Sequence, residues 1–92
     1  MKTIEDAVWK IMENPAGVCA KIMLDNGIEI SIALNQATYG GDSGMFEICV
    51  FPKNSWKALE MKCFNGHDVA GWLSFADVNK KIIEIQEELK VE

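Results

Sequence analysis

The 92-residue chain has no arginine: its nine basic residues are all lysines, against fourteen acidic residues, and the net charge is −5. Arginine supplies the planar fork that binds phosphate groups and guanine through paired hydrogen bonds. The lack of arginine, together with the negative charge, disfavours direct binding to nucleic acid. A surface that mimics the charge of DNA remains an alternative to an ordinary solvated acidic surface.

Long apolar runs are missing as well. No uninterrupted apolar stretch approaches the roughly 20 residues that a membrane helix needs. Residues 1–6 place acids where the apolar part of a signal peptide would begin. We therefore expect no contact with a membrane and a cytoplasmic location.

Cysteine and histidine are scarce. Cys19, Cys49 and Cys63 are odd in number and widely spaced, which excludes a Cys-x-x-Cys motif and a disulfide framework. With His67 as the single histidine, no set of residues has the spacing of metal ligands. We expect reduced cysteines that pack as small apolar residues, and neither a metal nor a cofactor.

What is present is the composition of a globular chain, with 49% hydrophobic and 25% charged residues. A chain of this length can form one hydrophobic core but not two. Residues 1–92 are therefore predicted to be a single small domain.

The clearest pattern lies in residues 18–34, VCAKIMLDNGIEISIAL, where apolar residues alternate on both sides of Asp25-Asn26-Gly27. This is the period of two strands joined as a hairpin. A two-residue Asn-Gly turn would place the two apolar sets on opposite faces, whereas a three-residue loop over 25–27 places them on one face. The partners predicted by this register are Val18 with Leu34, Ala20 with Ile32, Ile22 with Ile30, and Leu24 with Ile28.

Helices are predicted at both ends of the chain. Thr3, followed three residues later by an acid, is typical of a helix N-cap, and the apolar spacing after it predicts a short helix from about Ile4 to Glu13. Ser74 begins the same capping pattern, and an amphipathic stripe follows it. We expect the second helix to span about 75–90 and to cover the apolar face of the sheet.

Two more strands complete the predicted fold. MFEICVF, about 45–51, has strand chemistry, with Phe46, Ile48 and Val50 on one face and Met45, Glu47, Cys49 and Phe51 on the other. Residues of about 56–63 alternate less regularly, as expected of an edge strand. Between the strands, residues 35–44 are rich in glycine and predict a mobile exposed loop. The predicted fold is α+β, a four-stranded antiparallel sheet with two helices in the order α-β-β-β-β-α.

The second face of the predicted sheet is mixed in character. If both helices cover the Ile30 side, several sulfur-containing and apolar residues gather on the other side and suggest a dimer or partner surface. The alternative is that the N-terminal helix covers this face, and the sequence leaves both open. The residues expected to bind a partner, including those of the glycine-rich loop, are Met23, Tyr39, Asp42, Met45, Cys49 and Phe51.

Tryptophan is the other candidate for binding. Trp9, Trp56 and Trp72 could anchor a partner, since aromatic residues are enriched at binding hot spots. In so small a domain we expect such residues more often to pack in the core or at its rim.

Two motifs for chemistry fail on inspection. Gly41-Asp42-Ser43-Gly44 copies the nucleophile motif of trypsin-like proteases, but that family needs two barrels and a histidine far upstream of the serine, whereas His67 follows it. His67 beside Asp68 could form a base with an orienting carboxylate, but adjacent residues rarely orient each other in that way. A polar turn explains both residues, and catalysis is not expected.

Several segments resemble a family of small, uncharacterised phage and prophage proteins. They are DNGIEISI (25–32), Tyr39 in a glycine-rich loop, EICVF (47–51), and DVAGWLS (68–74) before a final helix. In that family a "DNG…SV" strand precedes "E-x-A-V-[WF]", and "D-V-x-G-[WY]-[LC]-[ST]" opens the last helix. The chain departs from the pattern in its third turn, where Pro52-Lys53-Asn54-Ser55 stands in place of Asp-Gly. The resemblance implies phage origin and a bacterial host cytoplasm, with no catalytic residue to carry over.

The sequence thus favours a non-enzymatic phage accessory protein that binds a host protein and inhibits it, as anti-CRISPR and other anti-defence proteins do. The expected partner is a host protein, with a homodimer as a further expectation. One alternative is a small-molecule binder that sequesters a signalling nucleotide, with the glycine-rich loop around a phosphate and Lys21 or Lys53 supplying charge. A third is a small enzyme, or an enzyme subunit, that uses His67.

Overall fold

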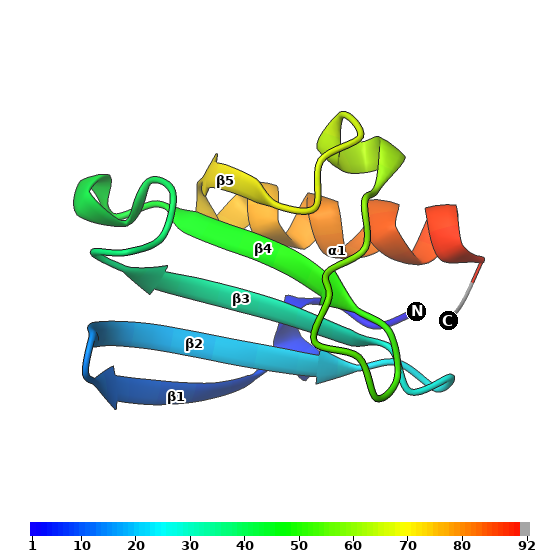
Figure 1. The fold of residues 1–92 in the computed structure, drawn as a ribbon, viewed down its shortest axis with the longest axis horizontal. Coiled ribbons are helices and arrows are strands. Elements are labelled where there is room, and N and C mark those ends of the chain that lie inside the picture. The colour runs from blue at the N-terminus through cyan, green and yellow to red at the C-terminus, as the bar shows by residue number, and fades with distance from the viewer. Residues whose placement is uncertain (91–92) are drawn as a thin grey trace.

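The computed structural model describes residues 1–90 and shows an α+β protein built on one five-stranded antiparallel sheet. Strands follow one another in the sheet in chain order, β1-β2-β3-β4-β5, and α1 lies behind the sheet in the view of Figure 1. The elements are η1 (Ile4–Asp6), β1 (Val8–Glu13), β2 (Ala16–Met23), β3 (Glu29–Asn35), η2 (Gly41–Ser43), β4 (Phe46–Phe51), η3 (Lys62–Phe64), β5 (Ala70–Leu73) and α1 (Phe75–Leu89), where η denotes a 3₁₀ helix.

The β2–β3 hairpin has the predicted register. Val18 pairs with Leu34, and Ile22 pairs with Ile30. The three-residue loop is closed by hydrogen bonds from the Leu24 amide to the Ile28 carbonyl, 2.8 Å, and from the Gly27 amide to the Leu24 carbonyl, 3.0 Å. Gly27 has a φ of +82°, the left-handed conformation that this type of loop requires. The observed pairing confirms the predicted register. The physical reason is that only this register places both apolar sets on one face.

That apolar face forms the core with α1. Ser74 and Asp77 cap the helix reciprocally, as predicted, and Lys90 ends it in a left-handed conformation. The apolar stripe of α1 therefore begins at a defined residue and faces the sheet throughout its length. The buried hydrophobic side chains are Ala20, Ile22, Leu24, Ile30, Ile32, Ile48, Val50, Met61, Phe64, Leu73, Val78, Ile82 and Ile85.

The predicted N-terminal helix over Ile4 to Glu13 is wrong. The Thr3 capping box does form, but it caps a single 3₁₀ turn, η1, and the chain then becomes β1. A capping box determines where a helix begins, not how long it is. Pairing with β2 gives the backbone of Val8–Glu13 interstrand hydrogen bonds along the whole strand, so the tertiary partner overrides the helical spacing.

The predicted strand over 56–63 is also wrong. The chain from Pro52 to Met61 has no regular structure, and the hydrogen bond from the Leu59 amide to the Val50 carbonyl, 2.8 Å, is its link to β4. The position beside β4 belongs instead to β5, a segment directly before α1 that was not predicted to be a strand. Met61 and Phe64 are buried because η3 turns them into the core.

The structure also settles which face the helices cover. Both α1 and η1 lie on the Ile30 side, where Ile4 packs against the core. On the other side, within residues 1–90, no helix covers the sheet. We call this side the open face; its residues from β2, β3 and β4 are Cys19, Lys21, Met23, Glu29, Ser31, Ala33, Glu47, Cys49 and Phe51.

Candidate functional site

Strand pairing arranges the open face in rows that cross β2, β3 and β4. One row is Met23, Glu29 and Phe51. Side chains directly opposite one another in neighbouring strands are close enough to interact, and so are diagonal neighbours in adjacent rows. The two rows beside it are Lys21, Ser31 and Cys49, and then Cys19, Ala33 and Glu47.

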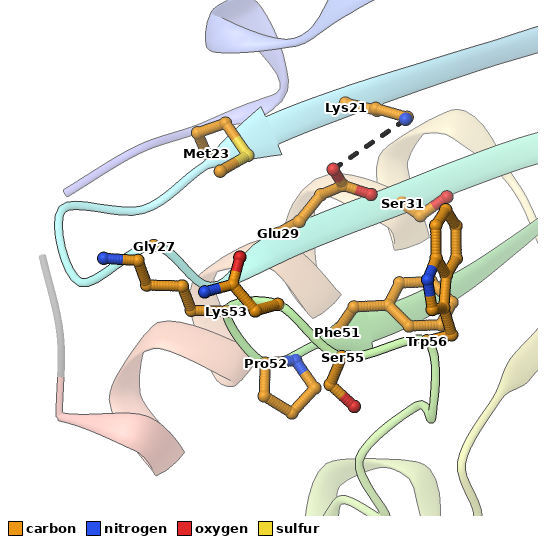
Figure 2. A pocket seen from close by; sticks show the side chains of 11 residues that line it. Lys21, Met23, Gly27, Glu29, Ser31, Phe51, Pro52, Lys53, Ser55 and Trp56 are labelled. Atoms are coloured by element: carbon orange, nitrogen blue, oxygen red, sulfur yellow. Dashed lines mark ion pairs between the residues drawn. The ribbon is translucent and has the colours of Figure 1, made fainter.

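A groove of about 740 Å³ lies at the Met23 end of the open face. Its floor comes from the ends of β2, β3 and β4, and its wall comes from the loop that follows β4 (Figure 2). This volume falls within the range of about 300–1,000 Å³ that is common for ligand sites. The lining residues are Lys21, Met23, Gly27, Glu29, Ser31, Phe51, Pro52, Lys53, Asn54, Ser55 and Trp56.

The wall of the groove is a turn. The Ser55 amide donates to the Pro52 carbonyl at 3.2 Å, the Ser55 hydroxyl accepts from the Lys57 amide at 3.2 Å, and Asn54 has a φ of 59°. This turn directs Trp56 out of the core, and the residue is 98% exposed. A tryptophan in contact with water over nearly its whole surface is a large apolar area available for binding.

Of the two lysines that line the groove, one forms an ion pair within residues 1–90 and the other does not. The Lys21 ammonium lies 3.8 Å from the Glu29 carboxylate, and such an exposed ion pair contributes little to stability. Lys53 lies at the other end of the groove, with its aliphatic stem against Gly27 (Figure 2). Among the described residues Lys53 forms no ion pair. The groove therefore carries one unmatched positive charge on a chain whose net charge is −5.

The structure divides the six residues predicted to bind a partner. Met23 and Phe51 line the groove, and Cys49 lies one row away on the open face. Tyr39, Asp42 and Met45 lie in the β3–β4 connection, at the other end of β4 and about 17 Å away along the strand.

Trp56, one of three tryptophans considered as possible anchors, is not among the six residues predicted to bind, because it was placed in an edge strand. The signal that could have located it is the turn composition of Pro52 to Ser55, immediately before Trp56. The other two tryptophans differ from each other. Trp9 packs against Phe46 and Phe75 at the rim of the core, as expected, whereas Trp72 is 60% exposed.

The glycine-rich loop is compact rather than open. The amides of Gly41, Ser43, Gly44 and Met45 all donate to carbonyls within the loop, at 3.0 to 3.1 Å. The Tyr39 amide donates to the Glu47 carboxylate at 2.8 Å. Amides already used in this way, beside an acidic side chain, are poorly suited to hold a phosphate.

His67 lies exposed in the turn after η3, where its backbone carbonyl accepts from the Met61 amide at 3.0 Å. Between residues 1 and 90 no hydrogen bond or ion pair joins the imidazole to Asp68 or to another carboxylate. A second cavity of about 310 Å³ includes His67, Cys63 and Lys81 in its lining. His67 thus contributes to this turn through its backbone carbonyl.

The cysteines are free thiols. Burial, followed by the negative charges of Glu47 and Asp68, raises the pKa of Cys49 to about 11. Burial and a hydrogen bond with Glu88 raise the pKa of Cys63 to about 11 as well. Both side chains are therefore protonated near neutral pH, the form with little nucleophilic reactivity.

Comparisons of the chain with protein-family models, curated proteins and solved structures give no match. Over residues 1–90, no helix has both the length and the apolar character needed to span a bilayer. In the same part of the chain, no three His, Cys, Asp or Glu side chains are grouped as metal ligands.

Proposed function

We propose that this protein is a non-enzymatic binding protein that recognises another protein through the groove and the adjoining open face. The observation that carries the proposal is the exposure of Trp56 at the edge of a groove of suitable volume. Tryptophan is among the residues most enriched at binding hot spots, since it removes a large apolar area from water on binding. Nothing in the fold of residues 1–90 uses the Trp56 ring for packing.

The side chains of the groove indicate which residues a partner would present to it. Trp56, Phe51 and Met23 offer apolar and adaptable surface, which favours insertion of an apolar side chain. Lys53 supplies a positive charge that favours a carboxylate beside it. We infer that the partner presents an apolar residue next to an acidic one.

The resemblance to phage proteins supports a more specific role. In this proposal the partner is a protein of the bacterial host, the site of action is the host cytoplasm, and binding inhibits the partner, which is a component of antiviral defence. Binding would inhibit the target by covering its functional surface; this role rests on analogy with such phage proteins, because a fold by itself does not determine a function.

A pull-down experiment tests the proposal: the native chain and Trp56→Ala are each used as bait in host lysate, and the captured proteins are compared. The matched control is Tyr39→Ala, which removes an exposed aromatic side chain at the far end of the sheet. The captured protein is then purified and its affinity measured for each variant and for Lys53→Glu. We expect Trp56→Ala to weaken binding by about thirtyfold or more, because truncation of a hot spot costs about 2 kcal/mol or more. We expect Lys53→Glu to weaken binding most at low salt.

Two outcomes count against the proposal. One is that the native chain captures no partner at micromolar concentration. The other is that Trp56→Ala binds as tightly as the native chain while Tyr39→Ala loses affinity, which would move the site to the β3–β4 connection. Circular dichroism of each variant shows that the fold is retained.

A small-molecule ligand is the second candidate, favoured by the groove volume and by Lys21 and Lys53 beside two aromatic rings. In this form the ligand occupies the groove, not the glycine-rich loop. Thermal-shift measurements with cyclic nucleotides and ADP-ribose derivatives test it, since a bound ligand raises the melting temperature. No shift with any of them removes this candidate.

A further inference from the structure

The sheet ends in two edge strands that differ in length and in regularity. β5 has four residues, its register with β4 is interrupted between Phe46 and Ile48, and Trp72 within it has a φ of +58°. β1 has six residues, all exposed, and pairs with β2 without interruption. An edge strand presents a row of unpaired amides and carbonyls, so β1 is the longer and more regular template for a further strand.

The side chains of β1 do little to prevent pairing. Natural edges are protected by charges, prolines or bulges, but β1 is VWKIME, with Lys10 as its single charge before Glu13 at the end. Ile11 is 86% exposed. Trp9 lies on the same side of the strand as Ile11, and its ring stacks on Phe75 of α1 at 6.3 Å. An apolar stripe of Phe75, Trp9 and Ile11 therefore extends to the free edge.

We propose that β1 pairs antiparallel with β1 of a second copy, joining two sheets into one continuous sheet across a two-fold axis. The second copy is the occupant because the strand complements itself. Lys10 and Glu13 cancel, so the seam carries no net charge although the whole chain is at −5. Two acidic chains can therefore meet at this edge without repulsion between the strands themselves.

The register follows from the side chains. A two-fold axis through the sheet keeps each face on its own side, so a residue at the axis lies opposite its own copy. An axis at Lys10 pairs residues 8–12 but sets two lysines against each other, which is destabilising. An axis at Ile11 pairs residues 9–13, sets Ile11 against Ile11 and places Lys10 opposite Met12. The proposed interface has its axis at Ile11.

Cysteine cross-linking tests the interface and its register together. Residues directly opposite in antiparallel strands have Cα atoms about 4.5–5.5 Å apart, inside the range of about 4.4–6.8 Å for a disulfide. We expect Ile11→Cys to form a cross-linked dimer in high yield under mild oxidation. Lys10→Cys is the matched control, since an axis at Ile11 shifts the two copies of residue 10 by roughly 7 Å along the strand. The native chain, with three free and partly buried cysteines, gives the background.

Light scattering measures the mass in solution. We expect the native chain to be a dimer at micromolar concentration, Ile11→Lys to be a folded monomer, and Trp56→Ala to remain a dimer. The proposal is overturned if the native chain stays monomeric, even if a strand of another protein then pairs with β1. Cross-linking of Lys10→Cys in place of Ile11→Cys overturns the register. Because Trp56 and Ile11 lie on different surfaces, failure of the dimer and failure of partner binding are separate results.

Discussion

At the scale of single residues, Gln86 makes the most specific contact in the core. It is fully buried in α1, and its amide forms two hydrogen bonds with the backbone of Lys2, at 2.8 and 2.7 Å, and one with the Ile82 carbonyl at 3.0 Å. Asn79, two turns earlier, accepts from the Ile4 amide at 2.9 Å. Two amide side chains of one helix thus hold the N-terminal segment in place.

We predict that Gln86→Leu lowers the free energy of unfolding by about 1–3 kcal/mol, because it leaves the partly buried backbone groups of Lys2 without partners. Urea denaturation followed by circular dichroism measures the change. Glu87→Leu is the control on the exposed side of the same turn, with an expected effect of about 0.5 kcal/mol or less. Equal effects of the two substitutions would contradict a specific role for the Gln86 amide.

Glu88 links α1 to η3 through its carboxylate. The two oxygens accept from the amides of Lys62 and Cys63, each at 2.8 Å. These hydrogen bonds, that of Lys62 first, lower the pKa of Glu88 below its ordinary value of 4.5. A carboxylate with a lowered folded-state pKa contributes stability that is present above its ordinary pKa and is lost as the pH falls through the folded-state pKa.

We therefore predict that the free energy of unfolding decreases as the pH falls below about 4.5, and that Glu88→Gln reduces this decrease. Urea denaturation at a series of pH values measures both slopes. Glu87→Gln serves as control because its carboxylate is exposed one residue away. If Glu88→Gln and Glu87→Gln change the pH dependence equally, the amides of η3 do not hold the carboxylate.

At the scale of elements, the β2–β3 loop connects the fold to the groove. Gly27 has the left-handed φ that the loop needs, and a Cβ there would lie 2.9 Å from Cδ of Lys53. The contact is with a flexible side chain, so Lys53 can move aside at little energetic cost. The residue that closes the hairpin thus also positions a lysine of the candidate site.

A pair of alanine substitutions separates these two roles. Gly66 has nearly the same φ as Gly27, +84° against +82°, but nothing lies within 4 Å of its added Cβ. We predict that Gly27→Ala and Gly66→Ala each destabilise the protein by about 1–2 kcal/mol, the cost of a left-handed alanine. Only Gly27→Ala should shift the Trp56 indole signal in an NMR spectrum, since it alone displaces Lys53. An unchanged indole signal would mean that the loop does not shape the groove.

At the scale of the whole molecule, one-sided packing leaves the binding surfaces free. The radius of gyration, 12.2 Å, is that of a compact chain of this length, about 12 Å. Among the described residues, α1 is the single long helix, and it covers one face of the sheet. A compact protein with one covering helix leaves its open face and the β1 edge in contact with solvent, the surfaces to which we assign partner binding and dimer formation.

The candidate site was predictable only in part. Met23, Cys49 and Phe51 follow from the register, because alternation in β2 and β4 places them opposite the apolar set. Trp56 and Lys53 lie in an irregular segment, where no periodicity relates a residue to a face. The position of Lys53 beside Gly27 and that of Trp56 at the edge of the groove depend on how the loop after β4 crosses the sheet, and no local pattern encodes that path.

Local chemistry in the sequence determined the β2–β3 register, the strand at Phe46–Phe51 and the capped helix α1, because alternation, a glycine turn and a capping box each act over a few residues. Tertiary structure alone decided the rest. Whether Val8–Glu13 became helix or strand depended on the free edge of β2, and whether 56–63 or Ala70–Leu73 took the place beside β4 depended on competition for one set of hydrogen bonds. These outcomes depend on hydrogen bonding between segments that are distant in sequence, so the residue pattern within one segment does not determine them.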